Sequence, residues 1–151
     1  MSKENSTFSR ILVAIDGSEL SLNAAEKALD LARFFGANLY AITVSYIPES
    51  YHLQQEDVMN KSKNMKDSMT DAKKWLDNFM QDAKKYNVIL KTELINSHRP
   101  VDYVIMEYAE QEKMDLIVMG TRGSSGLKNL LLGSVVSSVI TYAHCPVMVV
   151  K

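Results

Sequence analysis

The chain has 151 residues, of which 46% are hydrophobic, and this length fits one compact domain that buries most of its apolar surface. Its 17 Lys and Arg against 18 Asp and Glu exclude the strong basic field that general binding to nucleic acid or to an anionic membrane surface needs. The single cysteine, Cys145, excludes an internal disulfide, and every apolar run is far shorter than the ~20 residues of a membrane span. We therefore expect one cytoplasmic domain over residues 1–151 with a local binding site and no membrane or nucleic-acid partner.

Strands and helices alternate along the first half of the chain. Residues 11–15 are a short apolar run that stops at residues 16–18, Asp-Gly-Ser, which is typical of a strand buried on both faces. Apolar residues then recur at spacings of three and four, which predicts an amphipathic helix that ends at Gly36. The next apolar stretch, residues 39–46, is rich in β-branched residues and predicts a second strand.

The middle of the chain is less regular. Residues 49–64 show no clean period, and we interpret them as a loop or a frayed helix. Spacings of four and three from residue 65 predict a long helix that ends near Tyr86, with Trp75 just off its apolar stripe as a half-exposed contact or a dimer residue. Residues 88–95 predict a third strand.

The last third of the chain begins with a predicted helix over residues 101–109, with Pro100 in its first turn. A buried-strand run over residues 116–119 stops at Gly120. Residues 135–143 then predict a helix, and residues 146–150 a last strand.

This fivefold alternation predicts a doubly wound α/β fold, with a five-stranded parallel sheet and helices on both of its faces. In such folds ligands bind outside the carboxyl ends of the strands, at the point where the strand order reverses. The rule directs attention to Asp16, to the end of the second strand and to the residues from Gly120 onward.

A glycine-rich stretch from Gly120 to Ser134 joins a predicted strand to a predicted helix. Glycine is needed where a backbone adopts positive φ or approaches a ligand closely, and Gly120, Gly123 and Gly126 are placed for both. Gly133 and Ser134 open the next helix, whose free N–H groups favour a phosphate. The stretch fits neither the Walker pattern nor G-x-G-x-x-G, so a glycine-shaped surface loop stays open as an alternative.

At this point the sequence resembles the universal stress protein family, specifically its ATP-binding branch. The likeness rests on Gly120-x-x-Gly123 followed by nine residues and Gly133-Ser134, on the Val-Ala-Ile-Asp-Gly-Ser of residues 13–18, and on the terminal Pro-Val-Met-Val-Val of residues 146–150. It covers nearly the whole chain and implies an adenine nucleotide, ATP or else ADP or AMP. Separately from the resemblance, Mg²⁺ can accompany such phosphates.

The resemblance also implies positions for the nucleotide. The adenosine moiety would lie by the end of the first two strands, and the ribose and phosphates by the glycine-rich stretch and the helix after it. The site residues it implies are Ala14, Ile15, Asp16, Val44, Met119, Gly120, Arg122, Gly123, Gly133, Ser134 and Val135. From its residue type alone, Asp16 suits a turn or helix N-terminus equally well.

The resemblance further implies a homodimer in which residues 147–150 pair with their copy, which would cover an apolar edge strand. The predicted function is an ATP-binding regulatory protein with little or no turnover, because no general base or nucleophile converges on the phosphate cradle. Two alternatives remain: a slow ATPase or other nucleotide-dependent enzyme of the same fold, and an interaction domain that binds no nucleotide.

Overall fold

The computed structural model describes residues 7–48, 73–121 and 132–151. The stretch that we interpret as a loop or frayed helix, the start of the helix predicted from residue 65, and residues 122–131 of the glycine-rich stretch lie outside the described residues. None of the described helices combines the length and the apolar character needed to cross a membrane.

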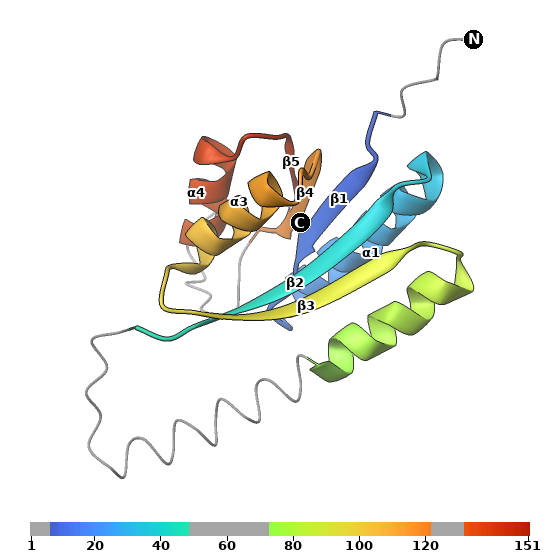
Figure 1. Ribbon diagram of the computed structural model, residues 1–151, viewed down its shortest axis with the longest axis horizontal. Coiled ribbons are helices and arrows are strands. Elements are labelled where there is room, and N and C mark those ends of the chain that lie inside the picture. The colour runs from blue at the N-terminus through green and yellow to red at the C-terminus, as the bar shows by residue number, and fades with distance from the viewer. Residues whose placement is uncertain (1–6, 49–72, 122–131) are drawn as a thin grey trace.

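Five strands form one parallel sheet, as the alternation predicts, in the order β3-β2-β1-β4-β5 (Figure 1). The strands are β1 (Arg10–Ala14), β2 (Asn38–Tyr46), β3 (Leu90–Ser97), β4 (Leu116–Gly120) and β5 (Val147–Val150). The chain moves outward from β1 to β3 on one side and then crosses back to β4 on the other. The strand order therefore reverses at β1, between β2 and β4.

Helices cover both faces of the sheet (Figure 1). The helices are α1 (Glu19–Phe35), a helix over residues 73–85, α3 (Val101–Gln111) and α4 (Ser134–Tyr142). Successive residues of a strand point to opposite faces, so β1 supplies both cores. Ile11 and Val13 pack with α1 and the helix of residues 73–85, whereas Leu12 packs with α3 and α4. The doubly wound α/β fold is confirmed.

Local chemistry explains where α1 begins and ends. Ser18 has extended backbone angles and its side chain accepts a hydrogen bond from the Ser21 N–H, so it caps the start of the helix. Gly36 ends it in the left-handed conformation at φ 65°, where a residue without Cβ is favoured. Pro100 is the N-cap residue of α3, one position before the first turn in which we predicted it.

Candidate functional site

A cavity of about 230 Å³ opens at the carboxyl edge of the sheet, where the strand order reverses. Its floor is apolar and comes from the ends of β1, β2 and β4 on the face covered by α3 and α4. Its walls come from the first turns of α3 and α4 and from the turn before α1. The described residues that line it are Ala14, Ile15, Asp16, Ser21, Ile42, Val44, Val101, Ile105, Met119, Gly120, Gly133, Ser134, Val135 and Val136.

The structure gathers the predicted site residues around this one cavity, with the exception of Arg122 and Gly123, which lie outside the described residues. The gathered residues come from positions as far apart in the chain as Ala14 and Val135. The switch-point rule therefore located a concavity in the structure.

The backbone of β2 continues past the end of β1. The Asn38 N–H donates to the Ser9 carbonyl just before β1 (2.9 Å), and the Ile42 carbonyl accepts from the Ile15 N–H just after it (2.8 Å). The even-numbered residues of β2 therefore direct their backbone groups toward β1, and alternation directs the N–H and C=O of Val44 to the same side. Because β1 ends at Ala14, which pairs with Ile42, β1 has no residue that pairs with Val44. The backbone groups of Val44 therefore face the cavity.

The structure gives Gly120 a packing reason to be glycine. A Cβ at this position would lie 2.9 Å from the backbone carbon and oxygen of Leu20, in the first turn of α1. Its φ is not among the positive values, which belong to Gly17 and Gly36 in the described glycines. The small residue therefore lets α1 approach β4 closely, and the prediction of a positive φ at Gly120 is wrong.

The first turn of α4 forms the opposite wall. Gly133 is the N-cap residue at φ −67° and ψ 161°, and its N–H donates to the Thr121 carbonyl at 2.9 Å. That bond joins the two ends of the glycine-rich stretch. It also uses the Gly133 amide within the protein, so this amide is not the phosphate donor that we expected.

The next amides take its place. No side chain caps α4, and the helix's first bond to a backbone carbonyl is the one from the Ser137 N–H to Gly133 (3.0 Å). The N–H groups of Ser134, Val135 and Val136 therefore have no acceptor within the helix. All three residues line the cavity, where their partial positive charge favours an anion.

Asp16 fills the turn role that its type permits. One carboxylate oxygen accepts from the Ser18 N–H (2.9 Å) and from the Ser18 hydroxyl (2.5 Å). The Ser21 hydroxyl donates to the Ser18 carbonyl (2.9 Å), which closes a small network at the start of α1. The same turn also places Asp16, which is exposed, on the cavity rim. Its role in the turn is therefore compatible with the predicted ligand contact.

Sequence reasoning missed the lining residues Ser21, Ile42, Val101, Ile105 and Val136. Ile42 had a signal, because it lies two residues before Val44 and so shares its face of β2. Val101 and Ile105 follow from the i, i+4 stripe of α3, but nothing in the sequence says which end of that stripe meets the cavity.

One hydrogen bond joins the two helical walls. The Ser138 hydroxyl of α4 donates to the Asp102 carboxylate in the first turn of α3, at 2.6 Å and partly buried. It joins α4 to the first turn of α3, next to the lining residue Val101. In the part of the chain that the structure describes, no group of three or more His, Cys, Asp or Glu side chains is arranged to hold a metal ion.

The sequence model of the universal stress protein family matches residues 7–151. The chain belongs to this family. Among its relatives, it is 39% identical to the universal stress protein MJ0531 of Methanocaldococcus jannaschii over 145 residues, which is 95% of this chain and 82% of that protein.

Solved structures of universal stress proteins share the fold. The protein UspA from Lactobacillus plantarum superposes with a TM-score of 0.85 at 28% identity, over 97% of this chain and 100% of that one. A universal stress protein in complex with cAMP superposes with a TM-score of 0.70 at 25% identity, over 97% of this chain and 99% of that one. The match to the family and to its fold confirms the resemblance seen in the sequence.

Proposed function

We propose that this universal stress protein binds an adenine nucleotide, ATP or else ADP or AMP, in the cavity at the carboxyl edge of the sheet. The observation that carries the proposal is the convergence there of the α4 amides, the Val44 backbone groups and an apolar floor. The similar universal stress protein in complex with cAMP supports the ligand class, because cAMP is an adenine nucleotide. Membership in the ATP-binding branch is part of the same proposal.

In the proposed arrangement the adenine ring lies on the apolar floor beside Ala14 and Met119, and its edge meets the backbone groups of Val44. Purine edges carry both donors and acceptors, so adjacent N–H and C=O groups suit them. The phosphates lie at the first turn of α4, by the amides of Ser134 and Val135. Asp16 lies on the rim near the ribose.

The two predicted residues outside the described part complete the phosphate end. We assign Gly123 a backbone contact and Arg122 a side-chain charge, in place of the lysine that a Walker loop would supply. Each charge-assisted hydrogen bond contributes about 1.5 to 3 kcal/mol, so four or five of them are enough for micromolar affinity, which is about 8 kcal/mol, after ordering costs.

We propose a regulatory role with little or no turnover. Among the described residues that line the cavity, Asp16 is the one with a titratable side chain, and its carboxylate is held by Ser18. A general base must reach the attacking water, and a carboxylate committed to a turn is poorly placed for this. Mg²⁺ would accompany the nucleotide phosphates and neutralise part of their charge.

We further propose a cytoplasmic homodimer that forms through β5. This strand is at one edge of the sheet and pairs with β4 on its other side. Met148 on β5 is 37% exposed, and Tyr142 at the end of α4 is 74% exposed. Pairing β5 with its copy would cover an apolar edge that otherwise favours aggregation. Light scattering at micromolar concentration tests this by giving the mass of a dimer or a monomer.

The central experiment is to purify the protein without added nucleotide, denature it and identify the small molecules released. ATP is then titrated into the emptied protein, and its conversion is followed for hours with magnesium. Retained or titratable nucleotide without turnover supports the proposal. Steady release of ADP or AMP supports the slow enzyme instead, and no binding at millimolar nucleotide supports the interaction domain.

A further inference from the structure

Trp75 is the protein's single tryptophan, and it packs against the turn that carries Asp16. The turn contains Gly17 at φ 84°, a backbone conformation that favours glycine. A Cβ at Gly17 would overlap the indole, and its nearest neighbours would be Cζ3, Cη2 and Cε3 of the six-membered ring. The tryptophan ring therefore occupies the space that any other residue at position 17 would need.

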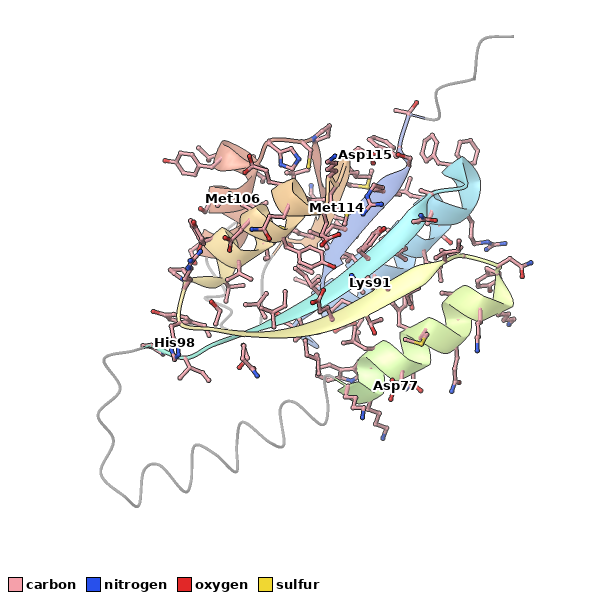
Figure 2. All side chains as sticks on the ribbon, viewed as in Figure 1. Asp77, Lys91, His98, Met106, Met114 and Asp115 are labelled. Carbon is pink, nitrogen blue, oxygen red and sulfur yellow. The ribbon has the colours of Figure 1, made fainter. Side chains whose placement is uncertain are left out.

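This contact is separate from the core packing of the same helix. Leu76, Phe79 and Ala83 are buried in the core cluster shared with α1, whereas Trp75 is half-buried. Asp77 lies on the outer side of this helix, away from the sheet (Figure 2). Near the described start of the helix of residues 73–85, Trp75 therefore contacts the turn that carries the lining residue Asp16.

The turn is constrained from two sides. From within, Ser18 binds the Asp16 carboxylate and the Ser21 N–H. From outside, the indole closes off the Gly17 backbone. Asp16 and Ser21, on either side of Gly17 and Ser18, line the cavity, whereas Trp75 does not.

We propose that Trp75 is a positioning residue for the nucleotide site: it holds the turn of residues 16–18 in the binding conformation and couples site occupancy to the helix of residues 73–85. The inference rests on the proposed function, because it concerns the same cavity. Of the two alternatives for Trp75, a half-exposed contact or a dimer residue, the contact with Gly17 and the half-buried side chain agree with the first. Packed contacts couple the nucleotide site to Trp75 only if binding and the surroundings of Trp75 change together. Such a joint change can be measured.

The first test uses Trp75 as its own reporter. The wild-type protein, emptied of nucleotide, is titrated with AMP and separately with ATP, while tryptophan emission is recorded with selective excitation and binding is measured by calorimetry. We expect the emission to change in step with calorimetric saturation. Calorimetric binding with unchanged emission overturns the coupling alone, whereas a wild-type protein that binds neither nucleotide overturns the proposed function.

The second test compares dissociation constants and unfolding midpoints of variants. Trp75→Ala should weaken binding about three- to tenfold, which lies within the range of couplings that act through packed neighbours, and Trp75→Phe should recover affinity because it keeps a flat ring on Gly17. Phe79→Leu, one helical turn later in the core, is the matched control, and it should lower the unfolding midpoint without changing affinity.

Two results overturn the proposal. One is an unchanged dissociation constant in Trp75→Ala, whatever its emission or midpoint. The other is an equal loss of affinity in Phe79→Leu, which would mean that binding follows the stability of the helix and not the contact with Gly17.

Discussion

The parallel strands have an aspartate at each end, Asp115 at the amino edge of the sheet and Asp16 at the carboxyl edge, and the two carboxylates do different things. At the amino edge, the Asp115 carboxylate accepts from the N–H and the hydroxyl of Ser9, both at 2.8 Å, and from the Arg10 N–H at 3.1 Å. The Asp115 N–H returns a bond to the Arg10 carbonyl at 2.9 Å. At the carboxyl edge, the Asp16 carboxylate accepts from Ser18 within its own turn, and the cavity opens beside it.

Figure 2 shows the two ends, with Asp115 beside the start of β1 and His98 at the far end of β3. The difference lies in where backbone donors go. At the amino edge the Asp115 carboxylate accepts from amides at the start of β1, and the Asp115 N–H donates to the Arg10 carbonyl, which joins β4 to β1. At the carboxyl edge the amides at the start of α4 and the groups of Val44 face a concavity. Hydrogen bonds join the strands at the amino edge, and the carboxyl edge borders the cavity.

The largest expected effect is a loss of nucleotide affinity at the carboxyl edge. Gly133→Val adds a branched side chain at a residue that lines the cavity, with backbone angles that valine also adopts. We expect nucleotide affinity to fall by about a hundredfold or more, roughly 2.7 kcal/mol, with an unchanged circular dichroism spectrum. Gly123→Val should behave in the same way.

The control for this substitution is Gly36→Ala, at the end of α1. It costs about 1 kcal/mol of stability through its left-handed backbone and has no neighbour within 4 Å of the added Cβ. Nucleotide affinity should not change. Full affinity in both valine variants would contradict the phosphate position.

A second glycine of the same stretch should affect folding instead. Gly120→Ala places a Cβ 2.9 Å from the Leu20 backbone, so α1 must shift. We expect a loss of about 1 to 3 kcal/mol in the free energy of unfolding, measured by chemical denaturation. Wild-type stability in the Gly120→Ala variant would show that α1 has room at this point and that the close approach is not the reason for the glycine.

Asp115→Ala tests how much the hydrogen bonds at the amino edge contribute to stability. This substitution leaves the Ser9 and Arg10 amides without their acceptor and should cost about 1 to 2 kcal/mol of stability, reduced by their partial exposure. Nucleotide affinity should stay within about twofold of wild type, since the site is at the other edge. Asp77→Ala, on an exposed helix face, is the control with no expected effect.

The smallest expected effect concerns Cys145, which precedes β5 at the amino edge. Burial, and then the negative charge of Asp115, raises the pKa of its thiol. We expect native Cys145 to be alkylated more slowly than the unfolded chain at the same mildly alkaline pH, and Asp115→Asn to speed the reaction.

The raised pKa of the Cys145 thiol also makes the free energy of unfolding depend on pH. The unfolded thiol loses its proton at lower pH than the native one, so this contribution is fully present below the unfolded pKa and is lost as pH rises through the native pKa. Equal alkylation rates in the native and unfolded protein would contradict the shift.

Much of the fold follows from local pattern. The apolar runs predict β1, β2 and β4 to within a residue or two, and Gly36 marks the end of α1. Strand alternation and the switch-point rule then indicate where a site lies. These features depend on periodicity and chain order, which a single sequence contains.

The features that escaped prediction are contacts between distant elements. The reason for Gly120 is the path of α1, the use of the Gly133 amide depends on Thr121, and the meeting of Trp75 with Gly17 depends on how a helix docks. None of these has a spacing signal, because each joins segments whose separation is set by packing. The roles of Arg122 and Gly123 remain predictions.

The most direct measurement is a crystal structure of the protein grown with AMP and, separately, with ATP. The account predicts nucleotide density in the cavity, with the adenine edge against the Val44 backbone and a phosphate at the amides of Ser134 and Val135. Density at another surface, or an empty cavity in crystals whose protein binds the nucleotide in solution, would contradict it.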